Sequence, residues 1–148
     1  MNALFLRTLA AGLLAGRAFA ADGHATNTPA EPRPGHSMHG EAFNEGPRQA
    51  AHLMGGMPKV HFRVTTADAQ AQAFFDQGVG QLHGFWYFEA ERSFRQAYTL
   101  DTNCVMALWG MAMANQNNAF RAKKFIAEAS ARTNGLCARE VQWIMALH

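Results

Sequence analysis

The apolar positions between residues 69 and 115 recur with the period of a helix. Ala90, Phe94 and Ala97 follow one another at offsets of four and three, which places a small, a large and a small residue on one helical face. Gly78 lies twelve residues before Ala90, on the preceding helical run. Packed antiparallel helices need small residues where their backbones approach and a large residue beside them. The spacing therefore predicts a helical hairpin in which the Phe94 ring fills the space beside Gly78.

Turn residues divide the remainder of this part of the chain into further helices. Thr65 or Thr66 is expected to cap the first helix, with Asp68 in its first turn. Arg95, one position beyond Phe94, is expected to point to solvent. The pattern predicts helices at about residues 66–82, 87–100, 104–114, 119–132 and 139–147.

A short alternating stretch precedes the first expected helix. Val60, Phe62 and Val64 point one way, whereas His61 and Arg63 point the other. This alternation predicts an extended segment laid on the first helix pair.

The same residues resemble the tetratricopeptide repeat (TPR), which recurs every ~34 residues with a glycine, an A-x3-F element and a further alanine. Thr102 stands where that family usually has a proline. Three aromatic residues, Phe75, Trp109 and Trp143, are each separated by 34 positions. Residues 59–148 are similar to a group of exported bacterial proteins with degenerate repeats. The resemblance implies an all-α fold, with about two and a half antiparallel hairpins stacked as a short solenoid; an unrelated helical bundle is the alternative.

In this family the first helix of each hairpin lines a concave face that binds partners. The resemblance implies a non-enzymatic scaffold for protein–protein interaction, and an apolar, Met- and Trp-rich face suits a hydrophobic peptide or a partner helix. Alternatively, the face is covered within the chain, by later repeats or by residues 52–64. The inward positions implied by the family pattern are Gln72, Phe75, Val79, Leu82, Met106, Trp109, Met113 and Gln116.

The first 20 residues have the pattern of a signal peptide. Arg7 precedes an apolar run over residues 9–16, and Ala18-Phe19-Ala20 is a small-x-small cleavage signal. The apolar run is too short to span a bilayer. We therefore expect an exported protein, periplasmic or extracellular, without a membrane span after cleavage.

Export also changes the charge balance. The whole chain carries a formal net charge of +2, and removing Arg7 and Arg17 leaves eleven basic and eleven acidic residues. A near-neutral chain gives no argument for nucleic acid or for an anionic membrane as a partner. The sequence also has no catalytic constellation such as G-x-S-x-G or H-E-x-x-H, which favours a role other than catalysis.

Residues 21–58 contain all 5 prolines of the chain, and we expect an extended or disordered leader there. It includes His36, Met38 and His39, whose imidazole and thioether groups suit copper. A periplasmic copper-binding or copper-trafficking protein is therefore the alternative function. A specific metal site needs a fixed geometry, which nothing in this segment predicts.

Two further expectations concern the end of the chain and its cysteines. Ile144 and Leu147 are apolar with no sequence left to cover them, so we expect a fragment of a longer repeat protein or a truncated reading frame. The non-catalytic N-terminal part of a larger enzyme is a third alternative. Cys104 and Cys137 lie about one repeat apart. Stacked helices are separated by about 8–10 Å, farther than the about 7 Å between Cα atoms that a disulfide allows, so a regular stack disfavours a bridge.

Overall fold

A computed structural model describes residues 46–47, 49–57 and 59–148, and within them the secondary structure is helical, with no strand. The all-α fold is therefore confirmed. The expected signal peptide and most of the expected leader lie outside the described residues. The helices are α1 (Ala69–His83), α2 (Tyr87–Leu100), α3 (Met106–Ala114), α4 (Ala119–Ser130) and α5 (Ala138–Leu147).

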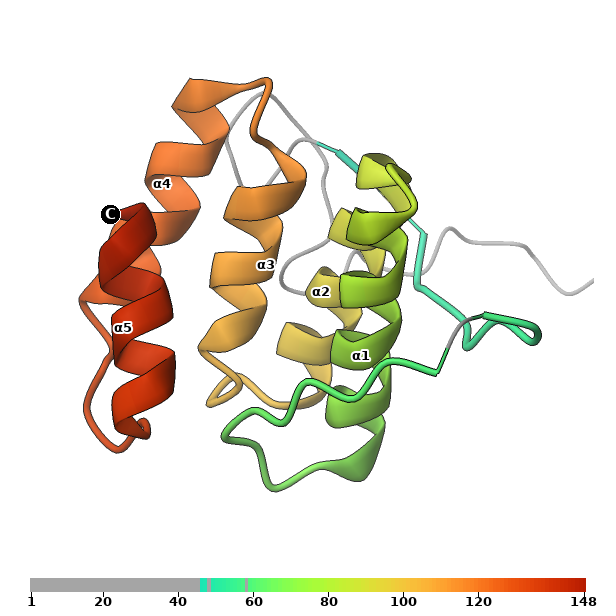
Figure 1. Cartoon of the computed structure of the whole chain (residues 1–148), viewed down its shortest axis with the longest axis horizontal. Coiled ribbons are helices and arrows are strands. Elements are labelled where there is room, and N and C mark those ends of the chain that lie inside the picture. Colours follow the sequence, from blue (N-terminus) through green and yellow to red (C-terminus); the bar gives the residue numbers. More distant parts are fainter. Residues whose placement is uncertain (1–45, 48, 58) are drawn as a thin grey trace, which may run out of the picture. The chain divides into compact units, whose positions relative to one another are not determined.

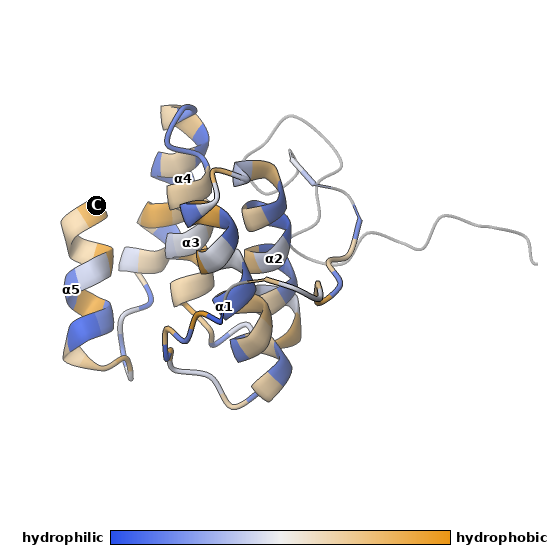
Figure 2. Ribbon diagram, turned by 45° about the vertical axis from the view of Figure 1, so that its right-hand side comes forward, coloured by the Kyte–Doolittle hydropathy of each residue, from blue (hydrophilic) through white to orange (hydrophobic). Residues whose placement is uncertain are grey.

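The helices of residues 59–148 form two layers. α1 and α2 make one antiparallel hairpin and α3 and α4 the next, and α5 packs against both α3 and α4 (Figure 1). α1, α3 and α5 lie side by side toward the viewer, and α2 and α4 lie behind them. Figure 2 shows hydrophobic and hydrophilic positions alternating around α4 and α5, as expected for helices with one buried face. We call the surface formed by α1, α3 and α5 the inner face.

Phe94 is the centre of the core that joins the two hairpins. Its side chain is fully buried, and its ring centroid lies 5.2 Å from that of Phe75. A Cβ at Gly78 would lie 2.6 Å from Phe94 Cε1, and a Cβ at Gly110 would lie 2.5 Å from Phe94 Cδ1. The predicted contact between Phe94 and Gly78 is therefore confirmed, and Gly110 of α3 approaches the same ring equally closely.

The start of α1 differs from the expectation that Thr65 or Thr66 caps it. Asp68 is the N-cap, and its carboxylate accepts hydrogen bonds from the backbone N–H groups of Gln70 and Ala71. The threonine hydroxyls are engaged elsewhere: Thr65 donates to Glu140 and Thr66 donates to Asp101. The two threonines thus fasten the chain ahead of α1 to distant elements instead of starting the helix.

Candidate partner-binding face

The eight positions implied by the family pattern lie on α1, on α3 and just beyond α3, with very different exposure. Four are buried, three are half-buried and one is exposed. Because the buried positions are covered by other parts of the chain, a partner could reach only the remainder in this structure. The buried positions are Phe75, Val79, Met106 and Trp109, the half-buried ones are Gln72, Leu82 and Met113, and Gln116 is exposed.

An extended stretch of the chain, residues 59–66, lies across the inner face and is called here the covering segment (Figure 1). Its Phe62 ring lies 5.8 Å from Phe75, 6.2 Å from Trp109 and 5.8 Å from Trp143, measured between ring centroids. The two tryptophans lie 5.4 Å from each other. The three aromatic residues that recur at the repeat period therefore form one pocket, and Phe62 fills it.

Side chains of α1 hold the backbone of the covering segment. The Gln72 side-chain amide donates to Phe62 O at 3.0 Å and accepts from Val64 N at 3.0 Å. Asp76 Oδ1 accepts from Phe62 N at 2.9 Å, and its other oxygen lies 3.0 Å from His61 Nδ1. These bonds satisfy the polar groups of an extended backbone that belongs to no sheet.

Two carboxylates fasten the end of the covering segment. Glu140 accepts from both the N–H and the hydroxyl of Thr65, and Asp101 accepts from Thr66 Oγ1 and Ala67 N. Burial opposes ionisation of Glu140, but the hydrogen bonds from Thr65 and Cys137 outweigh it and lower its pKa. Desolvation likewise opposes ionisation of Asp101, and its hydrogen bonds, chiefly from Thr66, lower its pKa. Both groups therefore hold the segment in their charged forms.

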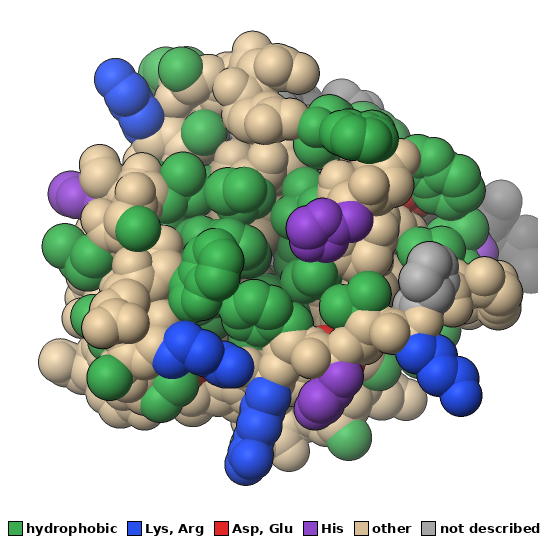
Figure 3. Space-filling model, in the orientation of Figure 1, with side chains coloured by type: hydrophobic (Ala, Val, Ile, Leu, Met, Phe, Trp, Pro, Cys, Tyr) green, Lys and Arg blue, Asp and Glu red, His purple; other side chains and the backbone are tan. Residues whose placement is uncertain are grey.

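The inner face remains open on one side of the covering segment. Figure 3 looks onto this face and shows hydrophobic side chains over its middle, Lys and Arg below them, and few acidic side chains. An apolar pocket of about 400 Å³ lies beside the segment, and its lining includes Met57, Val60, Gly80 and Trp86. Lys59, Arg63 and Arg139 are exposed. A more polar cleft of about 1130 Å³ borders the same segment, with Thr65, Asp101 and Glu140 in its wall.

The last part of the expected leader packs against the helices. The amide of Gln77 on α1 donates to His52 O at 3.0 Å and accepts from Met54 N at 2.7 Å. Pro47 is fully buried. Residues 49–57 form neither helix nor strand, and the described residues between 46 and 57 have contacts with α1 and α2 that the composition did not predict.

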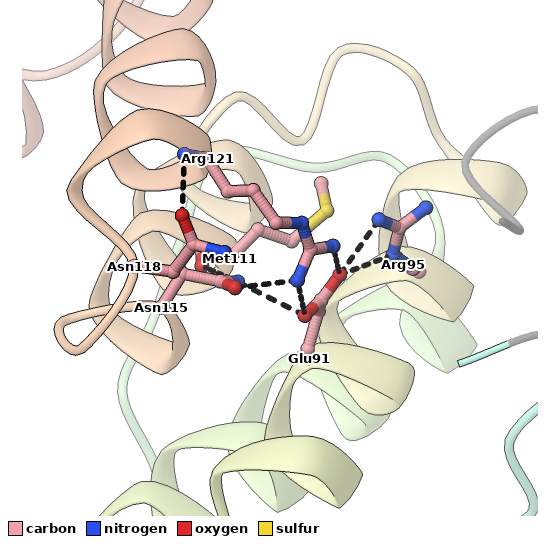
Figure 4. Close-up of polar contacts among 6 residues, drawn as sticks. All are labelled: Glu91, Arg95, Met111, Asn115, Asn118 and Arg121. Atoms are coloured by element: carbon pink, nitrogen blue, oxygen red, sulfur yellow. Dashed lines mark hydrogen bonds and ion pairs between the residues drawn. The ribbon is translucent and has the colours of Figure 1, made fainter. Parts of the chain in front are cut away.

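A buried ionic cluster joins α2, α3 and α4 (Figure 4). Glu91 Oε1 accepts from Arg95 Nε at 2.7 Å and from Arg121 Nη2 at 2.5 Å, and its Oε2 accepts from Asn115 Nδ2 at 2.9 Å. The expectation that Arg95 points to solvent is wrong: its side chain is fully buried and lies over Phe125. Burial lowers the pKa of Arg95, and Glu91 opposes that effect. The i,i+4 spacing of Glu91 and Arg95 was the sequence signal for this pair.

The described part of the chain contains no cluster of metal ligands and no disulfide. His36, Met38 and His39 lie outside the described residues, so the copper hypothesis stays a prediction. Among the residues described, no three His, Cys, Asp or Glu side chains are grouped so that they could hold a metal ion. Cys104 is buried, Cys137 is exposed, and both are free.

None of the helices described has the length and apolar character to cross a membrane. Comparison of the chain with protein-family models, with curated proteins and with solved structures found no match.

Proposed function

We propose that this protein is an exported, non-enzymatic helical-repeat scaffold of the TPR type, which binds a partner polypeptide on its inner face. The signal-like pattern of residues 1–20 supports export, and the recurrence of aromatic residues at 34 positions supports the repeat relationship. The layer arrangement also supports it, because the first helix of each hairpin lies in the same layer.

The observation that carries the proposal is that the inner face already holds an extended polypeptide. The covering segment is bound there through an aromatic pocket and through hydrogen bonds from Gln72 and Asp76 to its backbone. Beyond it the face is still apolar at Leu82 and Met113, which are half-buried, and Leu147 is 39% exposed. An apolar surface with basic residues at its border is typical of protein interaction sites. The proposed partner lies against this open part.

Selection of phage-displayed peptides on the full-length protein tests the proposal. The Leu82→Glu/Met113→Glu double variant places two charges in the open part of the inner face, and Lys123→Glu/Ala127→Glu places two at exposed positions of α4. Selected peptides should bind the wild type and the α4 variant equally. The inner-face variant should lose at least about tenfold in affinity, since burying an unpaired charge costs more than 1.4 kcal/mol.

Circular dichroism of both variants ensures that the comparison is between folded proteins. Peptides that bind the inner-face variant as tightly as the wild type would contradict the proposal. So would the failure of repeated selections to enrich any peptide.

A further inference from the structure

The covering segment shows what kind of polypeptide the inner face accepts. From its contacts we infer that the site takes an extended segment with the pattern apolar-x-aromatic-x-apolar, and that residues 60–64 occupy this site as a ligand within the same chain. The inference rests on the proposed function, and it adds the class of partner and the reason why the site is closed in this structure.

The hydrogen bonds recognise an extended backbone irrespective of its side chains. Gln72 uses both ends of its amide on the covering segment, donating to Phe62 O and accepting from Val64 N. Gln77, five positions along α1, does the same with His52 O and Met54 N, which lie before that segment. An amide that bridges a donor and an acceptor in this way replaces the neighbouring strand that an extended peptide would have in a sheet. Any extended polypeptide with its backbone in this register could make the same bonds.

The side chains of the covering segment supply the specificity. Val64 is buried and Val60 and Phe62 are half-buried, whereas His61 and Arg63 are exposed. The middle position needs an aromatic ring, because its pocket is made by rings of α1, α3 and α5. The guanidinium of Arg139 lies 5.0 Å from the centroid of the Phe62 ring, on the solvent side. A partner therefore needs apolar residues at alternate positions with an aromatic residue between them.

The arrangement allows a competing segment to enter. The bonds from Gln72 to Phe62 O and Val64 N, and from Asp76 Oδ1 to Phe62 N, join side chains of α1 to the backbone of the covering segment, so a second extended peptide could replace them one for one. The short connection to α1 gives the covering segment an effective concentration in the millimolar range at its own site. In the wild type, a free peptide must exceed that concentration to displace the segment. A substitution that weakens the contacts of the covering segment increases the fraction of protein molecules in which the site is empty. A free peptide should therefore bind such a variant more tightly.

The test uses the full-length Phe62→Ala variant and a fluorescent peptide with the sequence of residues 59–66, KVHFRVTT, blocked at both ends. The variant should bind this peptide at least about tenfold more tightly than the wild type does. A control peptide with alanine in place of phenylalanine should not bind. Adding Gln72→Ala to the variant should return the affinity to the wild-type value, because the backbone contacts are lost.

Three outcomes would overturn the inference: equal binding by wild type and Phe62→Ala, equal binding of the two peptides, or no binding by a folded variant. Phe62→Leu, which keeps an apolar side chain, replaces Phe62→Ala if the latter melts below the assay temperature, with the same results expected. If selected peptides bind through Leu82 and Met113 while KVHFRVTT never binds, this inference falls and the proposed function stands. If neither kind of peptide binds, both fall.

Discussion

The contact of Phe94 with two glycines predicts a specific failure of additivity. Gly110→Ala adds a methyl group 2.5 Å from Phe94 Cδ1, closer than unstrained atoms approach. Phe94→Ala removes the whole ring, including the Cγ, Cδ1 and Cε1 atoms that the new methyl would meet. The two substitutions should therefore compensate each other, although each alone destabilises the protein.

The expected magnitudes follow from the packing. Phe94 is fully buried, and Phe94→Ala should cost about 3–5 kcal/mol, the usual range for loss of a buried phenylalanine ring. Gly110→Ala gains about 1 kcal/mol of helix propensity but overpacks the core at a cost of about 1–3 kcal/mol. In the Phe94→Ala background the methyl enters vacated space, so Gly110→Ala should be neutral or stabilising. The coupling energy between the two sites should be about 1–3 kcal/mol.

Urea denaturation of the wild type, both single variants and the double variant measures this coupling. Phe88→Ala is the matched control, since Phe88 is also on α2 but is 56% exposed. It should change the free energy of unfolding by less than about 0.5 kcal/mol and should not couple to Gly110→Ala. Additive free energies at positions 94 and 110 would refute the packing of the two hairpins around Phe94.

Three other predictions concern charge and thiol chemistry. Arg121→Ala should lower the free energy of unfolding by about 3–5 kcal/mol in a urea melt, because it leaves Glu91 buried without one of its cations, whereas Lys123→Ala on the exposed side of α4 should cost less than about 0.5 kcal/mol. The lowered pKa values of Glu140 and Asp101 stabilise the covering segment above their usual pKa values of about 4.3 and 3.9, and this contribution is lost as the pH falls below them. Tryptophan emission should therefore shift to the red below about pH 4, and Glu140→Gln should reduce the shift. A thiol reagent should modify exposed Cys137 in the folded protein but reach Cys104 only after unfolding, since burial raises the pKa of Cys104 to about 12; equal rates for the two thiols would contradict the fold.

The helices were largely predictable from the sequence because strong local signals mark their ends. Helix α2 has the predicted bounds, since a glycine-containing turn precedes it and Asp101 follows it. The start of α1 was predicted too early because three residues, Thr65, Thr66 and Asp68, can all cap a helix. Only the positions of Glu140 and Asp101, far along the chain, decide that the two threonines bind elsewhere.

The sequence predicted an extended segment laid on the first helix pair, but not the hydrogen bonds that hold it there. The family resemblance implied the inner-face positions, and the alternation of apolar and polar residues placed Val60, Phe62 and Val64 on one side of an extended segment. Whether that segment lies on the face depends on Gln72 and Asp76, whose polar side chains carry no apolar signal. The buried ionic cluster was missed for the same reason, because a pattern of apolar positions assigns every arginine to solvent.

The central claim, that a partner polypeptide binds the inner face, is tested most directly by NMR with a peptide selected on the wild-type protein. Methyl signals of Leu82 and Met113 report on the open part of that face, and those of Ala127 and Ala131 report on exposed positions of α4 and its end. The account predicts that saturating peptide shifts the first pair and leaves the second pair unchanged. Shifts at Ala127 and Ala131, with Leu82 and Met113 unaffected, would contradict it.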